Sequence, residues 1–166
     1  MSLRYLALGD SYTVGEAVPE AGRFPVQLAH QLREEGFAEL EDPHVIATTG
    51  WTTDELSAGI DAASPAGAFD LVTLLIGVNN QYRGRSLDEY RAQFRELLER
   101  GISFAACKQD RVIVISIRFG SVSSACLSLK ESLRAGARGA ARRAVGHRGH
   151  GAAPWTDCGY AGQRWV

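Results

Sequence analysis

The sequence predicts an α/β protein, in which a parallel sheet lies between helices on both of its faces. Over residues 1–117, strand patterns and helix patterns alternate four times along the chain, which is typical of parallel strands joined by helices. One of the strand patterns, FDLVTLLIGV, is apolar at nearly every position. A continuous apolar run of this kind indicates a central strand that is covered on both faces.

Four segments have the composition of strands. Each is short and rich in apolar or β-branched residues, and glycine or polar residues lie at its ends. The expected strands are residues 3–8, 44–48, 69–76 and 111–117, the last of them buried like the others.

Three helices are expected between these strands, near residues 23–35, 52–62 and 86–100. The second and third begin with the spacing of a capping box, in which a hydroxyl residue is followed three residues later by Glu. The two pairs are Thr52 with Glu55 and Ser86 with Glu89. The third helix also carries an apolar stripe on one face, formed by Leu87, Tyr90, Phe94, Leu97 and Leu98.

The composition is ordinary for a globular chain of 166 residues, with 45% hydrophobic and 22% charged residues. A net charge of −1 favours neither nucleic acid nor an anionic membrane as a partner. The longest apolar run is far shorter than the ~20 residues of a membrane-spanning helix, and no signal peptide is visible. Cys107, Cys126 and Cys158 lack the spacing of metal ligands. We therefore expect a cytoplasmic protein with free thiols, no metal and no cofactor.

Charge is distributed unevenly along the chain. Residues 1–117 contain 10 Lys and Arg against 17 Asp and Glu, a net charge of −7, whereas residues 118–166 contain 8 against 2, a net charge of +6. The second segment also holds 8 of the 18 glycines and few large apolar residues. We expect residues 1–117 to form the α/β core and residues 118–166 to form an atypical basic tail of the same domain, incomplete or irregular in structure.

Three of the expected strands end on residues that suit acyl-transfer chemistry. Ser11 follows the first strand, Gly50 the second and Asn79 the third. The carboxyl ends of parallel strands meet at one edge of a sheet, where sites form. A serine hydroxyl can act as a nucleophile, while backbone N–H groups and a side-chain amide can donate hydrogen bonds to an oxyanion.

The segments ALGDSYTVG, TTGWTT and LLIGVNNQYRG resemble, in order and spacing, the first three sequence blocks of the SGNH (GDSL-type) hydrolases. The resemblance covers about residues 4–117. It implies a flavodoxin-like three-layer α/β/α fold and esterase or lipase activity on a small-molecule ester. It also implies that Ser11 is the nucleophile and that Ser11, Gly50 and Asn79 form the oxyanion hole.

Each of these residues also has a purely structural alternative. Asp10 or Ser11 can cap a helix, while Gly50 and the Asn79–Asn80 pair can serve turns. By the resemblance, Asp10 is the structural acid of its motif rather than a catalytic one. Asn80 stands where many family members have Asp.

The fourth block of the family, Asp-x-x-His, is absent from this sequence. In the family it supplies the general base and the carboxylate that orients it, both of which a serine nucleophile needs. We expect His30 on a solvated helix face and His44 at the wrong edge of the sheet. Only His147 and His150 come late enough to act as the base, and neither follows an acid by three residues. Slow ester hydrolysis that changes little when either is removed is therefore expected.

A shift of reading frame shortly after Ile117, natural or from a sequencing error, is our hypothesis for both the lost block and the change in charge. The family continues this strand with a Pro-Asp-aromatic-Gly turn, whereas IRFGSVSS follows here. Resequencing the gene and measuring the mass of the expressed protein tests the hypothesis.

Three functions are compatible with these patterns. The first is an SGNH-type hydrolase that forms an acyl-serine intermediate. The second is a non-catalytic remnant of that fold with an incomplete site. The third is a flavodoxin-like module that binds a phosphate or cofactor with its GDSYTVG loop, although Asp10 would place a carboxylate next to the phosphate. A fluorophosphonate probe, which labels activated serines, separates the enzyme from the other two.

Overall fold

The computed structural model describes residues 2–117 of the chain. Four strands form one sheet in the order β2-β1-β3-β4, and every neighbouring pair is parallel. The parallel α/β fold expected from the sequence is thus confirmed, and each strand lies within its predicted range or one residue beyond it. The strands are β1 (Tyr5–Gly9), β2 (His44–Ala47), β3 (Leu71–Leu75) and β4 (Val112–Val114).

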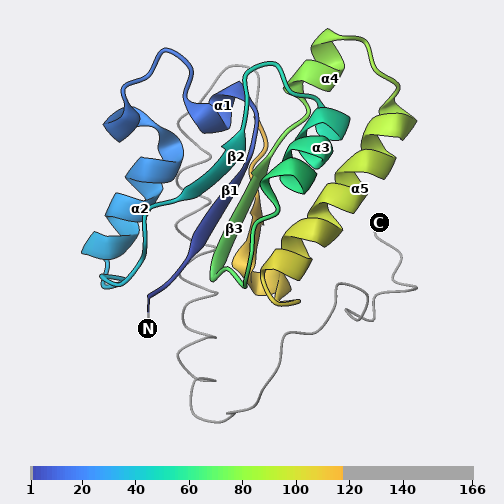
Figure 1. Cartoon of the computed structure of the whole chain (residues 1–166). Coiled ribbons are helices and arrows are strands. Elements are labelled where there is room, and N and C mark those ends of the chain that lie inside the picture. The colour runs from blue at the N-terminus through green and yellow to red at the C-terminus, as the bar shows by residue number, and fades with distance from the viewer. Residues whose placement is uncertain (1, 118–166) are drawn as a thin grey trace.

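Helices cover both faces of the sheet, as the three-layer prediction requires (Figure 1). Helix α2 (Phe24–Glu34) lies on one face, and helices α3 (Thr53–Ala63) and α5 (Leu87–Phe104) lie on the other. The three helices agree with the three that the sequence predicts. The expected capping box at the start of α3 is confirmed by a hydrogen bond of 2.9 Å from the Thr52 N–H to Glu55 Oε2.

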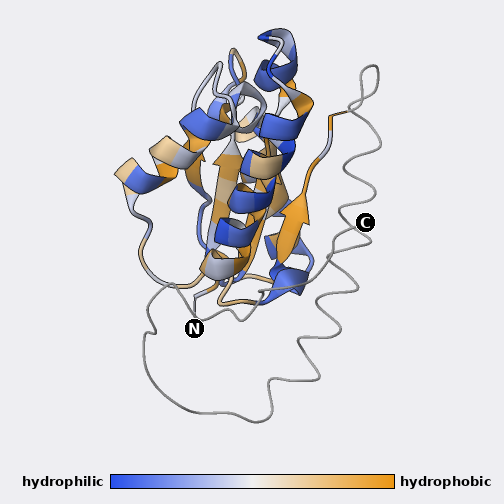
Figure 2. Cartoon of the chain, turned by 90° about the vertical axis from the view of Figure 1, so that its right-hand side faces the viewer, coloured by the Kyte–Doolittle hydropathy of each residue, from blue (hydrophilic) through white to orange (hydrophobic). Residues whose placement is uncertain are grey.

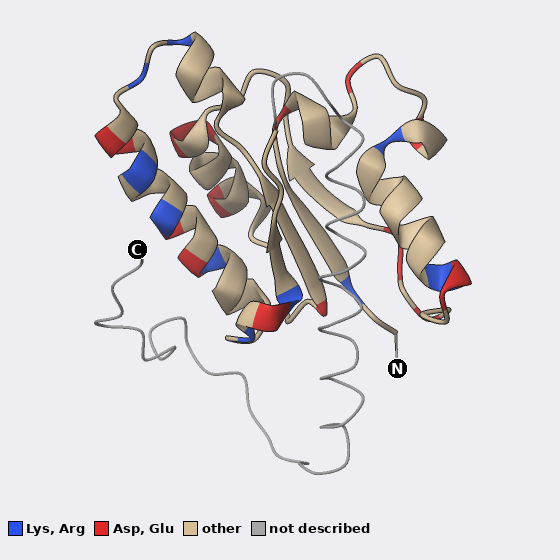
Figure 3. Ribbon diagram, turned by 180° about the vertical axis from the view of Figure 1, so that it is seen from behind, with Lys and Arg blue, Asp and Glu red and all other residues tan. Residues whose placement is uncertain are grey.

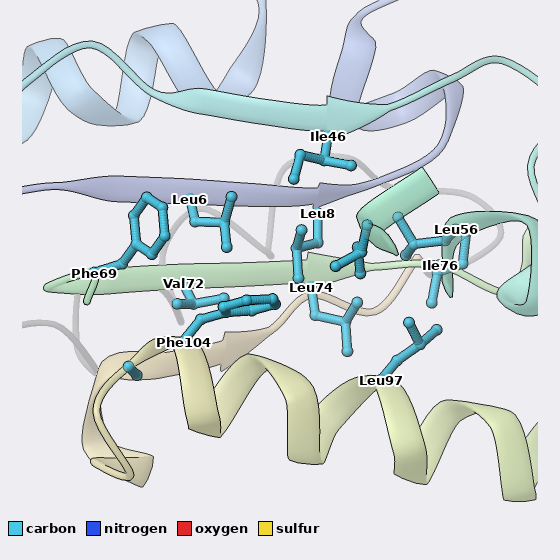
Figure 4. Packing of buried hydrophobic residues seen from close by; sticks show 12 residues of the cluster. Leu6, Leu8, Ile46, Leu56, Phe69, Val72, Leu74, Ile76, Leu97 and Phe104 are labelled. Atoms are coloured by element: carbon cyan, nitrogen blue, oxygen red, sulfur yellow. The ribbon is translucent and has the colours of Figure 1, made fainter. Parts of the chain in front are cut away.

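Each face of the sheet has its own hydrophobic core, because side chains alternate between the faces along a strand. Strands β1 and β3 are buried at every position, so the apolar run at residues 69–76 is a central strand as expected. The core between the sheet and helices α3 and α5 is the larger (Figure 4); its main members are Leu6, Leu8, Leu56, Ile60, Phe69, Val72, Leu74, Leu97 and Phe104. The core beneath α2 contains Tyr5, Ala7, Leu28, Ala29, Leu40 and Leu71.

Two short helices that the sequence did not predict follow the two central strands. Helix α1 (Ser11–Val14) comes directly after β1, and helix α4 (Val78–Tyr82) comes shortly after β3. Helices of this length contain little more than one turn, so no apolar periodicity marks them in the sequence. Two 3-10 turns, η1 (Glu20–Gly22) and η2 (Gln109–Arg111), complete the described elements.

The outer surface of α5 is hydrophilic and carries charges of both signs (Figures 2 and 3). The fully buried residues of α5 begin at Leu97. Leu87, in the first turn, is 58% exposed, so this turn does not join the predicted apolar stripe. The capping box predicted at Ser86 is also wrong, since Ser86 makes no side-chain capping bond. Glu89 instead accepts a hydrogen bond from Arg85 at 3.1 Å.

Two further expectations need correction. Strand β4 was expected to be buried, but in the described part of the chain it pairs only with β3, and Val114 is 46% exposed. Free thiols were expected, but Cys107 is disulfide-bonded.

The expectations for the tail, residues 118–166, lie outside the described residues. These include the tail's irregular structure, the hypothesised frame shift and the two late candidates for a base, His147 and His150. Within residues 2–117, no helix is long and apolar enough to cross a membrane.

Candidate active site

The three residues that the sequence singles out lie at one edge of the sheet. Ser11 is the first residue of α1, after β1; Gly50 lies beyond the end of β2; and Asn79 is the second residue of α4, after β3. In the strand order β2-β1-β3, β1 is the middle strand. Because the strands are parallel and adjacent, their carboxyl ends share one edge, and Ser11 follows the strand between the other two. Figure 1 shows α1 and α4 at this same end of the sheet.

A tight strand-to-helix turn presents Ser11. Asp10 is the N-cap of α1, and its Oδ1 accepts a hydrogen bond from the Tyr12 N–H at 3.0 Å. The carbonyl oxygen of Asp10 also accepts a hydrogen bond from the Thr13 N–H at 3.0 Å. Asp10 and Thr13 are buried, whereas Ser11 between them is partly exposed. The turn therefore leaves the serine accessible from the carboxyl edge of the sheet.

The carboxyl group of Asp10 is structural. Burial raises its pKa, although the hydrogen bond from the Tyr12 N–H acts in the opposite direction. Its Oδ2 has no hydrogen-bond partner within residues 2–117. A carboxyl group that is buried and committed to a helix cap holds the turn in place, as the resemblance implied for Asp10.

Gly50 is the third residue of a β-turn between β2 and α3. The Trp51 N–H donates to the Thr48 carbonyl oxygen at 3.3 Å, and the φ angle of Gly50 is +84°. The third position of a type II turn requires a positive φ, which glycine adopts without a steric penalty. The structural alternative for Gly50, a turn glycine, is therefore present, and it is compatible with an oxyanion-binding N–H.

The side chain of Asn79 reaches the same turn. Its Nδ2 donates a hydrogen bond to the Trp51 carbonyl oxygen at 2.9 Å. An amide nitrogen carries two N–H groups, so Nδ2 can donate a second hydrogen bond besides the one to Trp51. Asn79 and the turn of Gly50 are thus in direct contact at the edge where Ser11 lies.

Asn80 has a different role, as an anchor between α4 and α3. It is 3% exposed. Its Oδ1 accepts from the Thr53 N–H at 3.1 Å, and its Nδ2 donates to Thr53 Oγ1 at 2.7 Å. The Thr53 hydroxyl in turn donates to Gln93 Oε1 on α5. Three helices are joined in this way.

Neither histidine within the described residues can act on Ser11. His30 lies on α2 with a side chain that is 70% exposed, 3.7 Å from Glu34. His44 begins β2, paired with Leu6 near the start of β1, at the edge opposite Ser11. Both placements agree with the expectations from the sequence. The other two candidates, His147 and His150, lie outside the described residues.

The described residues therefore place a hydroxyl and hydrogen-bond donors at one edge of the sheet, and neither histidine of residues 2–117 lies at that edge. No group of His, Cys, Asp or Glu within residues 2–117 is arranged to hold a metal ion. Arg83, which the sequence analysis did not single out, contacts the turn of Gly50, and its Nη2 donates to the Gly50 carbonyl oxygen at 2.7 Å. Arg83 lies four residues after Asn79, one helical turn away, and this spacing could have indicated that the two residues share a face.

The sequence matches one family model over residues 7–165, that of the GDSL-like lipase/acylhydrolase family. No curated protein matches the chain.

Several solved structures share the fold. TesA superposes with a TM-score of 0.60 at 17% identity, over 82% of this chain and 73% of its own. AlinE4, an SGNH-hydrolase family esterase, superposes with a TM-score of 0.53 at 19% identity, over 86% and 96%. The lipase Lip_vut3 from a goat rumen metagenome superposes with a TM-score of 0.53 at 21% identity, over 80% and 73%.

Proposed function

The chain belongs to the GDSL-like lipase/acylhydrolase family, and we propose that it is a serine hydrolase that cleaves small carboxylic esters with Ser11 as its nucleophile. The observation that carries this proposal is the position of Ser11, Gly50 and Asn79 at a single edge of the sheet, with β1 in the middle. A nucleophile beside donors for an oxyanion is the arrangement that acyl transfer needs.

In the proposed reaction, Ser11 Oγ attacks the carbonyl carbon of the ester and gives its proton to a base. The carbonyl oxygen becomes an oxyanion, which accepts hydrogen bonds from the N–H groups of Ser11 and Gly50 and from the Asn79 amide. The C–O bond to the alcohol then breaks, the alcohol takes up the proton, and an acyl-serine remains. Water attacks the acyl-serine in the same way and releases the carboxylic acid.

We propose that this chain reacts slowly, because the family's Asp-x-x-His block is absent. A serine hydroxyl without its base loses several orders of magnitude in rate. We expect His147→Ala and His150→Ala to change hydrolysis little. Loss of most of the activity in either variant would assign the base to that histidine.

A fluorophosphonate probe and p-nitrophenyl acetate test the proposal. Fluorophosphonates form a covalent bond with an activated serine, so intact-mass measurement counts the labelled sites. We expect one label per chain and slow ester hydrolysis, both lost in Ser11→Ala. Ser86→Ala is the matched control, because Ser86 is exposed and makes no side-chain capping bond.

Two outcomes would contradict the proposal. Labelling that persists in Ser11→Ala would place the reactive serine elsewhere. A chain that is neither labelled nor active is a non-catalytic remnant, and one that is also stabilised by inorganic phosphate or a flavin is a binding module.

A further inference from the structure

One side chain, that of Arg83, joins the two segments that carry Gly50 and Asn79. Arg83 is the C-cap residue of α4, and its backbone N–H donates to the Asn79 carbonyl oxygen at 2.9 Å. Its Nη2 donates to the Gly50 carbonyl oxygen at 2.7 Å, and its Nη1 donates to Glu55 Oε1 at 3.2 Å. The guanidinium therefore extends from the helix of one proposed oxyanion residue to the turn of the other.

Glu55 provides a fixed anchor for the guanidinium. Its Oε2 accepts the Thr52 N–H at 2.9 Å at the start of α3. This backbone hydrogen bond, with those from the Thr52 hydroxyl and Arg83, lowers the pKa of Glu55 from its usual value. The planar, forked guanidinium of Arg83 can bond a carboxylate and a carbonyl oxygen at once, which the ammonium of a lysine does not reproduce.

Arg83 holds the carbonyl group of Gly50, which lies in the peptide plane that follows the one containing the proposed oxyanion donor, the Gly50 N–H. Because glycine has no Cβ, few steric limits fix the orientation of these two planes, so the contacts of the turn must hold them. The turn hydrogen bond between Trp51 and Thr48 is long, at 3.3 Å, whereas the bond from Arg83 is 2.7 Å. From this geometry we infer that Arg83 is a positioning residue that holds the Gly50 N–H in the orientation an oxyanion needs, an inference that rests on the proposed hydrolase function.

A role in positioning differs from a role in folding. The Arg83 side chain is 45% exposed and its partner Glu55 is 39% exposed. Ion pairs at such exposed sites contribute little to stability, because water and salt screen them. Removing the guanidinium is therefore expected to disturb the turn at Gly50 without unfolding the protein.

The test compares Arg83→Met with Arg85→Met in the full chain. Arg85 is a matched control because its side chain is similarly exposed, at 34%, and pairs with Asp54 and Glu89 rather than with the Gly50 turn. Two quantities are measured: the ¹H–¹⁵N resonance of the Gly50 amide, and the second-order rate constant for fluorophosphonate labelling.

We expect Arg83→Met to shift or broaden the Gly50 resonance and to lower the labelling rate about 10- to 100-fold, up to the cost of a misplacement by about 1 Å. Arg85→Met is expected to change neither, and Arg83→Lys, which keeps the charge, should fall between the two. If Arg83→Met melts at a lower temperature than Arg85→Met, Arg83→Lys takes its place in the comparison.

A Gly50 resonance that stays in place without the guanidinium, or that moves equally in both methionine variants, would overturn the inference. The Gly50 amide resonance can be measured whether or not Ser11 reacts. Failure of the wild-type chain to label therefore removes the hydrolase proposal, while the Gly50 resonance still decides whether Arg83 sets the turn.

Discussion

The side-chain amide of Asn79 donates a hydrogen bond to the carbonyl oxygen of Trp51 at 2.9 Å. Asn79 follows β3 and Trp51 follows β2, so this bond links the two strands on either side of β1 at their carboxyl ends. It fixes the plane of the amide, and the second N–H of Nδ2 is the one that we propose as an oxyanion donor. The bond therefore holds the Asn79 amide against the turn that contains Gly50.

Replacing Asn79 with Asp tests whether this amide is an oxyanion donor. Asp has nearly the same shape, but its carboxylate has no N–H to donate and would face the Trp51 carbonyl oxygen. We expect the rate of fluorophosphonate labelling at Ser11 to fall about 10²- to 10³-fold, the usual cost of one lost donor. Gln81→Glu makes the same chemical change at an exposed position of α4. Equal losses in the two variants would contradict a specific role for Asn79.

The buried hydrogen bonds of Asn80 predict a loss of stability in Asn80→Ala. Removing the side chain leaves the Thr53 N–H without its acceptor in a buried site, which costs about 1–3 kcal/mol. Asn80→Asp should cost less, because it keeps an acceptor for that N–H. Urea unfolding of the three chains measures the difference. Equal costs for Ala and Asp would contradict a stabilising role for the acceptor of the Thr53 N–H.

The buried carboxyl group of Asp10 predicts an unusual dependence of stability on pH. Burial raises its pKa above the ordinary value of 3.8, so the folded chain binds this proton more tightly than the unfolded chain does. Its contribution to stability is therefore fully present below pH 3.8 and is lost as the pH rises through the raised pKa.

Asp10→Asn removes this titration and keeps an acceptor for the Tyr12 N–H. We expect the free energy of unfolding of the variant, relative to wild type, to increase as the pH rises from 3.8. Urea unfolding at a series of pH values measures this difference. Asp88→Asn, at an exposed position of α5, controls for the loss of one negative charge. A relative stability that does not change with pH would contradict the prediction.

The close approach at Gly9 predicts that Gly9→Ala is destabilising. A Cβ there would lie 2.5 Å from the Leu75 carbonyl oxygen and would also overlap the Thr13 side chain. Overpacking against backbone costs about 1–3 kcal/mol or more. Gly101→Ala is the matched control, since a Cβ in that part of α5 would meet Val112 at an ordinary 3.6 Å. Alanine favours a helix more than glycine does, so Gly101→Ala is expected to stabilise the folded chain by about 0.5–1 kcal/mol. Thermal unfolding distinguishes the two opposite shifts.

Local patterns were enough to predict the longer elements. The apolar run of β3 and the Thr52–Glu55 capping box before α3 are properties of a few consecutive residues, and both appear in the structure. The apolar pattern gave a wrong prediction where a short segment does not pack on the core. Leu87 fits the apolar spacing of α5, but its turn precedes the part of the helix that packs on the core, so it is exposed.

The sequence by itself determined the parallel α/β class and the order in which Ser11, Gly50 and Asn79 follow their strands, because strand and helix periodicities are local and parallel strands end at one edge. Only the tertiary structure decided which side chains hold that edge together. The contacts of Asn79 with Trp51, Arg83 with Gly50 and Asn80 with Thr53 join residues 28, 33 and 27 positions apart. Such contacts depend on how α4 packs beside the turn before α3, and no periodicity along the chain encodes the distance between two side chains that packing brings together.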